Sequence, residues 1–434
     1  MLSHSIEHGE SLLLRLALER KLLNSMTNTI LILGANTLQL PLINKANELG
    51  YQTLVVSPVL SEPGHKIATF SEVCNVVDEE GVLALAKKYD ICGIITDQTD
   101  LPVRTMAYVA NNMGLPGNDY EVAHLFTDKY LMREKCKEIG VKTLDYKLCH
   151  TVEEAESFYK TVNRDVIVKP VDNQGSKGVS KVLSIEELRS KFDEAIEYSR
   201  SSGVLIEEFV NGREFLVEGI CVNYEYQNLC CGDTDYFDIP DVFSASKREF
   251  PSIAPKDIVD KVLETNLKIG RRFGLKQGIT HAEYIMDGDD IILLEIAGRG
   301  GGVFISSDLI HLQTGLETEE FLLGIATGKV NKLPNLSWQN KSCCYISFFL
   351  PQGEVMWVNG VDDVINLPYT YHNNFETLTV GKEIKKNTDK TSRFFVILEA
   401  SDHEELMQRR DYIKSILKVD VLGKDGIHRG IIWN

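Results

Sequence analysis

Glu283, Glu295 and Arg299 are the residues of this chain whose types and spacing most directly suggest chemistry. Residues 287–290 form an acidic, glycine-containing turn flanked by apolar runs, a pattern that predicts a β-hairpin. Such a hairpin would place Glu283 and Glu295 on adjacent strands, and Arg299 adds a fixed cation just beyond them. Carboxylate oxygens suit Mg²⁺, which commonly uses one or two carboxylates together with nucleotide phosphates. The segment therefore predicts a site for phosphoryl transfer.

A loop at residues 172–179 is polar, rich in small residues and flanked by strand patterns. Glycine permits positive φ and close backbone approach, so such a loop can fold its N–H groups over phosphate oxygens. Many hairpin turns have a similar composition. The loop by itself therefore leaves both interpretations open.

Residues 205–210 form an apolar strand pattern in which Glu207 and Glu208 are embedded. A tight Asn-Gly turn follows, and then a second strand pattern with Glu214 and Glu218, as in a hairpin. An acidic, solvated sheet face is one interpretation of these acids. Glu207 favours another, because it follows an apolar run at the point where a buried strand would emerge into a cleft.

An alternation of strand and helix patterns opens the chain and predicts a parallel sheet. The expected strands are residues 29–34, 53–57, 73–77 and 91–96, and the expected helices between them include residues 38–49 and 82–89. Gly34 is not followed by the further glycines of G-x-G-x-x-G, so a dinucleotide site is not expected there. A second unit opens near Thr127 with a helix pattern that runs to about residue 139.

Length and composition indicate a soluble, multidomain globular protein. At 434 residues the chain exceeds one ordinary core, so two or three subdomains are expected. A net charge of -17 argues against a nucleic-acid-binding surface, although local basic pockets are compatible with it. The nine cysteines are odd in number and contain no C-x-x-C pair, which fits reduced thiols and a cytoplasmic protein.

No membrane association is expected, because no apolar run approaches the roughly 20 residues needed to cross a bilayer. The leucine-rich stretch at residues 12–23 is interrupted by charges, so it is neither a signal peptide nor a membrane span. Its helical spacing predicts an amphipathic helix or a partner-binding segment. Met26 is an equally plausible translation start, which leaves open whether residues 1–25 belong to the native product.

Taken in order, Lys129, VIVKP, the glycine loop, LIEEFVNGRE and HAEY…LLEIAGR resemble the ATP-grasp superfamily over about residues 28–430. The resemblance implies an α/β and α+β multidomain protein with the ATP-grasp fold. The implied parts are an N-terminal extension (1–27), a Rossmann-like preATP-grasp subdomain (28–126), a small ATP-grasp subdomain with the glycine loop (127–210), a large subdomain with the metal site (211–335) and a C-terminal α+β extension (336–434).

The resemblance also implies roles for the residues that match the motifs. Lys129 and Lys169 would contact the phosphates of ATP, and Glu283 and Glu295 would bind Mg²⁺ or Mn²⁺. Arg299 would hold an acyl phosphate. The other nucleotide-binding candidates are Gln174, Gly175, Ser176, Lys177 and Gly178 in the phosphate cover, Glu207, Glu208, Phe209 and Val210 in the adenine clamp, and Glu214 at the ribose.

Ala297 departs from the superfamily pattern, because many members carry a metal-binding asparagine there; one or two metal ions are therefore compatible with the sequence. The small residue is similar to that of bacterial amino-acid ligases, and other parts resemble carbamoyl-phosphate-synthase-like and biotin-carboxylase-like members. Gly300, Gly301 and Gly302 would either bind a substrate carboxylate through N–H groups or form a tight turn. His281 faces the same side of its strand as Glu283 and would orient a substrate or support a neighbouring ligand.

The resemblance predicts an ATP-dependent carboxylate–amine ligase that forms an amide or peptide bond through an acyl phosphate and releases ADP and phosphate. Two alternatives stay open: a purine-pathway or carboxylase-like enzyme that activates bicarbonate or formate, and an inactive nucleotide-binding relative. The expected partners are a small carboxylic acid and an amine, without nucleic acid or membrane. The identities of both substrates and the oligomeric state, a homodimer included, are left open.

Overall fold

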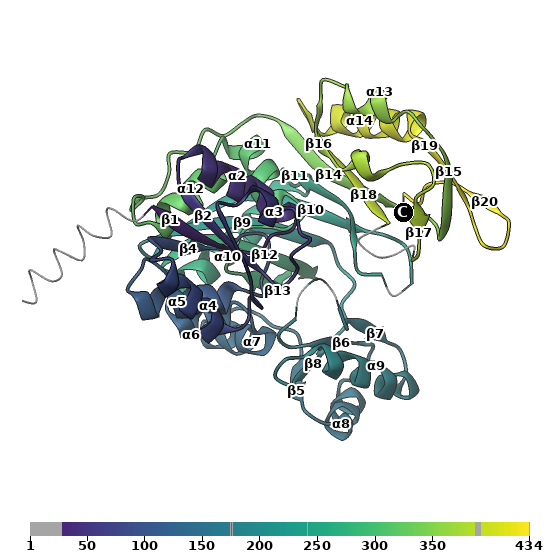
Figure 1. Ribbon diagram of the computed structural model, residues 1–434. Coiled ribbons are helices and arrows are strands. Elements are labelled where there is room, and N and C mark those ends of the chain that lie inside the picture. The colour runs from purple at the N-terminus through teal and green to yellow at the C-terminus, as the bar shows by residue number, and fades with distance from the viewer. Residues whose placement is uncertain (1–27, 174, 176, 241, 387–391, 434) are drawn as a thin grey trace, which may run out of the picture. The chain divides into compact units, whose positions relative to one another are not determined.

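The computed structural model describes residues 28–434 except 174, 176, 241, 387–391 and 434 (Figure 1). The expected N-terminal extension lies outside the described residues, as do Gln174 and Ser176 of the glycine loop. Within the described ranges, no helix combines the length and the apolar character that a membrane span requires. All nine cysteines are described and are free thiols, as the sequence predicts.

The chain divides into two compact units. Of the described residues, the first comprises those up to Ala123 and Glu319–Lys332, and the second comprises those of His124–Thr318 and from Leu333 onward. A segment far along the chain thus belongs with the N-terminal unit, which a linear division of the sequence does not anticipate.

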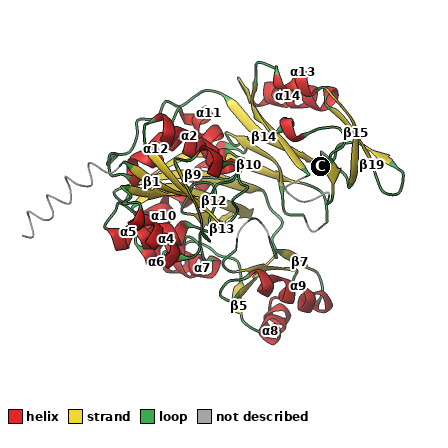
Figure 2. Cartoon of the chain, viewed as in Figure 1, coloured by secondary structure: helices red, strands yellow, loops and turns green. Residues whose placement is uncertain are grey.

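The first unit contains a parallel sheet in the order β3-β2-β1-β4, which confirms the predicted parallel topology. Figure 2 shows strand β1 of this sheet in yellow and the helices of the chain in red. Its strands are β1 (Thr29–Leu33), β2 (Gln52–Ser57), β3 (Phe70–Val73) and β4 (Gly93–Ile95). Its helices are η1 (Thr37–Gln39), α2 (Leu40–Glu48), α3 (Gly64–Ile67), α4 (Glu79–Lys88), α5 (Val103–Met113) and most of α12 (Thr318–Ala326), with α6 (Tyr120–Leu125) at its boundary. Strand β1 is buried along its whole length, because helices cover both faces of a parallel sheet.

The strand expected at residues 73–77 is wrong, because β3 ends at Val73. The apolar residues after it lie in the turn that leads into α4, where Val76 packs into the core. Asp78 caps α4 by accepting a hydrogen bond from the N–H of Gly81. Over a segment as short as residues 73–77, a buried turn and a buried strand show the same pattern of apolar residues.

The second unit begins with a small antiparallel sheet, ordered β5-β8-β6-β7. Its elements are α7 (Lys129–Glu138), β5 (Tyr146–Cys149), α8 (Val152–Val162), β6 (Val166–Pro170), β7 (Ser180–Val182), α9 (Ile185–Tyr198) and β8 (Val204–Glu208). The apolar faces of α8 and α9 pack on the sheet through a cluster that includes Val168, Phe192 and Ile206. Helix α7 confirms the helix predicted after Thr127.

An eight-stranded sheet, ordered β13-β12-β9-β10-β11-β14-β18-β16, forms the centre of this unit. Its strands are β9 (Glu214–Val222), β10 (Glu225–Tyr236), β11 (Ala245–Phe250), β12 (Gln277–Asp287), β13 (Asp290–Ala297), β14 (Ser342–Phe349), β16 (Thr370–Asn373) and β18 (Arg393–Ala400). The helical segments associated with it are α10 (Lys256–Arg272), the π-helix η2 (Ile305–Leu309) and α11 (Ile310–Thr314).

The hairpin expected around the Asn-Gly turn is wrong, because β8 and β9 belong to different sheets. Gly212 is required for another reason: a Cβ atom there would lie 1.9 Å from the carbonyl oxygen of Met286. The glycine permits this close backbone approach, and the chain crosses from the small sheet to the large one.

The C-terminal part adds a sheet ordered β17-β15-β19-β20. Its elements are β15 (Gly353–Asn359), α13 (Val361–Ile365), η3 (Phe375–Thr377), β17 (Glu383–Ile384), α14 (His403–Ile416), β19 (Lys418–Leu422) and β20 (His428–Arg429). Leu406 and Ile413 of α14 pack against Ile346 and Phe348 of β14 in one apolar core. Helix α14 therefore covers one face of the eight-stranded sheet near β14 (Figure 1).

Candidate active site

A cavity of about 560 Å³ in the second unit gathers most of the predicted nucleotide- and metal-binding residues. The predicted residues that line it are Lys129, Lys169, Gly175, Lys177, Glu207, Glu208, Phe209, Val210, Glu214, Glu283 and Glu295. The predicted residues that do not line it are Gly178, His281, Arg299 and the three glycines at 300–302. The cavity thus combines side chains from α7, the small sheet and the eight-stranded sheet.

Lys129 is fixed at this cavity by the start of α7. Asp128 caps the helix and accepts a hydrogen bond from the N–H of Leu131 at 2.9 Å. The ammonium of Lys129 donates to Oε1 of Glu295 at 2.9 Å and to the carbonyl oxygen of Asn173 at 2.8 Å. Lys129 therefore connects a metal-binding candidate with the start of the glycine loop.

Lys169 is held by a buried carboxylate. Lys169 on β6 and Glu207 on β8 are diagonal neighbours on one face of the small sheet and form an ion pair. Arg133 of α7 donates to both carboxylate oxygens of Glu207 and, at 2.7 Å, to the carbonyl oxygen of Leu294. Burial alone would raise the pKa of Glu207, but Arg133 and Lys169 outweigh it and hold the pKa at about 2.

Arg133 is a residue that the sequence analysis did not identify. It is fully buried, and its place on α7 is one helical turn after Lys129, on the same helix face. That spacing is the signal that could have suggested it. Because Arg133 and Lys169 occupy both oxygens of Glu207, this carboxylate positions Lys169 within the cavity wall.

One wall of the cavity is apolar, in contrast to the charged residues described above. Leu144, Val210, Ile285 and Leu294 pack together there and line the cavity. The ring of Phe209 also lines it and carries the ammonium of Lys181 3.8 Å from its centroid. A flat aromatic ligand could lie against such a surface, with the charged groups at the other end.

The hairpin predicted around Glu283 and Glu295 is confirmed. Strands β12 and β13 are antiparallel, and these two glutamates are direct partners in the register. Gly288 in the connecting turn has φ of +59°, a conformation that glycine adopts readily. Their side chains are 26% and 31% exposed, so both reach the cavity from a sheet that is otherwise well packed.

Glu283 has two basic neighbours. Nη2 of Arg248 donates to its Oε1 at 2.9 Å, and Nε2 of His281 lies 3.4 Å from the same atom. Burial alone would raise the pKa of Glu283, but the hydrogen bond from His281 and the charge of Arg248 lower it well below the usual range. From the sequence, Lys247 or Arg248 is expected either to meet a substrate carboxylate or, with more weight, to lie in a solvated basic turn. The structure instead places Arg248 on β11, beside Glu283.

Glu218 connects His281 to the glycine run after Arg299. It is completely buried, pairs with Nδ1 of His281 and accepts a hydrogen bond from the N–H of Gly301 at 3.1 Å. Burial would lower the pKa of His281, but Glu218 and Glu283 raise it. The acids of β9 are therefore not a solvated face, and the N–H of Gly301 anchors its turn to β9.

Arg299 follows the end of β13 and is half-buried; its Nη1 donates to the carbonyl oxygen of Gly300 at 2.9 Å. Two residues with positive φ, Val303 (+52°) and Phe304 (+63°), come shortly after it. Positive φ is uncommon for β-branched and bulky residues. Packing holds this conformation at Phe304, because its ring stacks on that of Phe395 with centroids 5.2 Å apart. The segment after Arg299 is thus a shaped, strained turn.

Glu214 is the predicted ribose ligand and has an unusual environment. It lines the cavity, and the hydroxyl of Tyr236 donates to its Oε2 at 2.6 Å. Burial raises the pKa of Glu214 to about 7, and the nearby charge of Glu283 adds to the effect, whereas the hydrogen bond from Tyr236 opposes it.

The residues of the cavity fit a hard divalent cation better than a zinc ion. Among the described residues, no group of three or more histidine, cysteine, aspartate or glutamate side chains could hold a metal ion by itself. Mg²⁺ needs only one or two carboxylates, because water and phosphate oxygens complete its octahedron. Glu283 and Glu295 supply that donor set, and Ala297 adds no ligand.

Comparison with known proteins agrees with this geometry. Residues 162–308 match the family model of the ATP-grasp domain. The chain is 25% identical over 288 residues to the alanine–anticapsin ligase of Bacillus subtilis strain 168, a match that covers 60% of each chain. The chain thus spans about 60% of the length of that curated relative.

Two solved structures share the fold. The L-amino acid ligase from Bacillus licheniformis matches with a TM-score of 0.74 and 18% identity over 91% of this chain and 98% of its own. The phosphoribosylglycinamide synthetase from Anaerococcus prevotii matches with a TM-score of 0.71 and 20% identity over 91% of this chain and 99% of its own. The chain therefore has the ATP-grasp fold and contains an ATP-grasp domain, as its ordered motifs predict.

Proposed function

We propose that the chain is an ATP-dependent carboxylate–amine ligase, which forms an amide or peptide bond and releases ADP and phosphate. The observation that carries the proposal is the single cavity lined by Lys129 and Lys169 together with the opposed carboxylates Glu283 and Glu295. Phosphoryl transfer requires cations that neutralise phosphate oxygens and acids that hold a divalent metal. The cavity contains both.

ATP would lie with its adenine on the apolar wall, next to Phe209 and Val210, and with its phosphates at Lys129 and Lys169. The carboxylate of Glu207 is occupied by two cations, so the adenine contacts in this region fall to the backbone after β8. Glu214 would meet the ribose hydroxyls. The residues proposed for the phosphate cover are Gln174, Gly175, Ser176, Lys177 and Gly178, with Glu208 at the rim of the adenine site.

Glu283 and Glu295 would hold Mg²⁺, or Mn²⁺, against the phosphates. When bound, the ion would neutralise charge on the phosphate oxygens and orient the transferred group. Arg248 and His281 orient Glu283 through direct contacts, and Lys129 orients Glu295. These contacts hold both acids in place.

In the proposed reaction, a carboxylate oxygen of the acid attacks the γ-phosphorus of ATP, the bond to the β-phosphate oxygen breaks, and an acyl phosphate and ADP form. An amine then attacks the acyl carbon, the carbon–oxygen bond to phosphate breaks, and the nitrogen loses a proton. Arg299 would hold the acyl phosphate, with N–H groups at Gly300 and Gly302 nearby. No covalent enzyme nucleophile is required.

The test is a coupled measurement of ADP release and amide formation with ATP, Mg²⁺ and pairs drawn from a panel of amino acids. The expected result is equal molar amounts of ADP, phosphate and a new amide, detected by mass spectrometry. Arg299→Ala should abolish turnover and leave ATP-analogue binding within about twofold. ADP release that needs bicarbonate or formate and yields no amide would replace this proposal with the carboxylase-like alternative; ATP binding without any turnover would replace it with the inactive one.

A further inference from the structure

A second cavity, of about 340 Å³, lies on the opposite face of the eight-stranded sheet from Glu283. Lys247 and Arg248 are neighbours on β11, so their side chains point to opposite faces. Arg248 pairs with Glu283, whereas Lys247 lines the second cavity. Lys247 is also the register partner of Ile346, which packs against α14. The second cavity is therefore on the α14 side and separate from the carboxylate pair.

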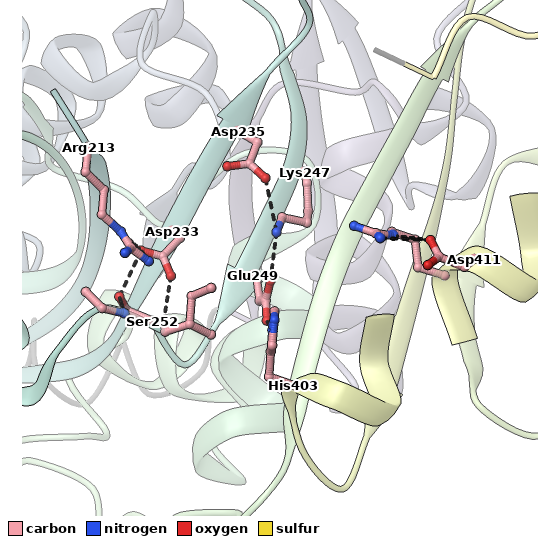
Figure 3. Close-up of polar contacts among 11 residues, drawn as sticks. Arg213, Asp233, Asp235, Lys247, Glu249, Ser252, His403 and Asp411 are labelled. Atoms are coloured by element: carbon pink, nitrogen blue, oxygen red, sulfur yellow. Dashed lines mark hydrogen bonds and ion pairs between the residues drawn. The ribbon is translucent and has the colours of Figure 1, made fainter. Parts of the chain in front are cut away.

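The first wall of this cavity is a closed polar network. Lys247 reaches Asp235 at 3.0 Å and Glu249 at 2.9 Å, and Glu249 also pairs with His403 at the start of α14 (Figure 3). These contacts satisfy Lys247 and fasten β11 to α14. They leave the recognition of a ligand to the remaining charged residues of the cavity.

Those remaining residues carry both signs of charge. Lys414 and Asp238 line the cavity, and neither takes part in an ion pair among the described residues. Arg410 lines it too and uses one edge of its guanidinium for Asp411, at 2.8 Å. Burial, and then the charges of Arg410 and Lys247, lower the pKa of Lys414. An anionic group bound next to the ammonium of Lys414 would raise this pKa again.

An aromatic surface completes the cavity. Trp433 lines it; the ammonium of Lys414 lies 5.2 Å from its ring centroid, and the ring centroid of Phe348 lies 4.6 Å from it. An apolar side chain of a ligand can therefore lie on the indole while its charged groups meet Lys414 and Asp238. A pocket with a cation, an acid and an aromatic wall suits a small molecule that carries a carboxylate and an ammonium group.

The two cavities share a wall. Tyr236 lines both, and its hydroxyl donates to Glu214 in the first cavity. The loop that follows β10 contributes Phe237 and Ile239 to the first cavity and Asp238 to the second. An occupant of the second cavity would therefore contact Tyr236 and Asp238, which are direct chain neighbours of Phe237 and Ile239 in the lining of the first.

We propose that the second cavity is a regulatory site for a free amino acid, whose carboxylate meets Lys414 and Arg410 and whose ammonium meets Asp238. Its occupancy alters nucleotide binding through Tyr236 and the loop after β10. The site itself is independent of the ligase activity proposed above; only its coupling to the first cavity rests on that function.

Trp433 provides a direct measurement of binding. The chain has three tryptophans, and Trp338 and Trp357 are exposed, so their replacement by phenylalanine leaves Trp433 as the single reporter. This protein is titrated with each standard L-amino acid in turn, with acetate and methylammonium as single-charge probes. At least one amino acid should give a saturable change in Trp433 fluorescence, and the single-charge probes should bind at least about tenfold more weakly.

Lys414→Gln and Asp238→Asn should each weaken the amino-acid response at least about tenfold. Lys414→Arg should retain it, and Lys424→Gln, which removes an exposed lysine elsewhere, should leave it unchanged. Near-ultraviolet circular dichroism verifies that each variant is folded. The proposal is overturned if folded protein shows no saturable response, or if Lys414→Gln and Asp238→Asn bind as tightly as the parent.

Coupling is measured as the affinity for a non-hydrolysable ATP analogue with and without the saturating amino acid. We expect at least a twofold change, lost in Lys414→Gln. An unchanged affinity would overturn the regulatory part. Because fluorescence and analogue binding need no turnover, a chain without ligase activity that still shows the Lys414-dependent response would contradict the proposed function alone.

Discussion

Glu207 and Glu283 are both carboxylates that pair with an arginine beside the first cavity, yet their surroundings differ. The side chain of Glu207 is 2% exposed, and Arg133 and Lys169 occupy both of its oxygens. The side chain of Glu283 is 26% exposed, and Arg248 and His281 both meet one oxygen, Oε1. A carboxylate enclosed by cations can only position its neighbours, whereas one with an open side can also bind a ligand. We therefore expect Glu207 to support the site and Glu283 to act in it.

Glu283→Gln should have the largest effect on activity. Loss of one ionised metal ligand is expected to lower kcat about 10²- to 10³-fold, as for other single electrostatic contacts in a transition state. The amide still accepts a hydrogen bond from Arg248, so the free energy of unfolding should change less than in the Arg133 variant described next. Steady-state kinetics and urea unfolding measure the two quantities. A variant with nearly full activity but greatly reduced stability would reverse the roles assigned to the two glutamates.

Arg133→Met should affect stability first. It leaves Glu207 buried with only one of its two cations, and removing one partner of a buried ion pair costs roughly 3–5 kcal/mol. Urea unfolding measures the loss. Arg164→Met is the matched control, because Arg164 pairs with Glu208 at an exposed position and should cost less than about 1 kcal/mol. An equal loss of unfolding free energy in the two variants would show that the buried Arg133–Glu207 pair stabilises the chain no more than an exposed ion pair does.

Glu214 differs from both, because burial raises its pKa from 4.5 to about 7, whereas the pKa values of Glu207 and Glu283 are lowered. Below about pH 4.5 this group is protonated in both the folded and the unfolded chain. As pH rises from about 4.5 to 7, the unfolded chain ionises first, so Glu214 lowers stability by up to about 3 kcal/mol and its effect levels off above pH 7. Glu214→Gln should remove this part of the pH dependence of unfolding. Parallel stability curves for the two proteins over that window would contradict the raised pKa.

The local parts of the site could be predicted from the sequence. The β12–β13 hairpin is encoded by an acidic glycine turn between apolar runs, and the start of α7 is encoded by the Asp128 cap. The parallel direction of the strands in the first sheet follows from alternating strand and helix patterns, although their order does not. The hairpin and the helix start each depend on residues close together in the chain.

The supporting residues could not be predicted in the same way, because their partners are distant in sequence. Arg248 meets Glu283 across the large sheet, and Glu218 meets both His281 and Gly301. Strands β8 and β9 lie where the sequence predicts strands, but hydrophobic periodicity does not determine which sheet a strand joins. The turn at Gly212 therefore looked like a hairpin, although it is a crossing between sheets.

The most direct test of the account is equilibrium binding of a non-hydrolysable ATP analogue as a function of Mg²⁺, compared between the natural chain and Glu295→Gln. If the two opposed glutamates hold the ion against the phosphates, the variant should need at least about tenfold more Mg²⁺ for half-maximal analogue binding. This corresponds to a loss of about 1.4 kcal/mol in the free energy of Mg²⁺ binding. The same Mg²⁺ midpoint in both proteins would contradict the placement of nucleotide and metal in this cavity.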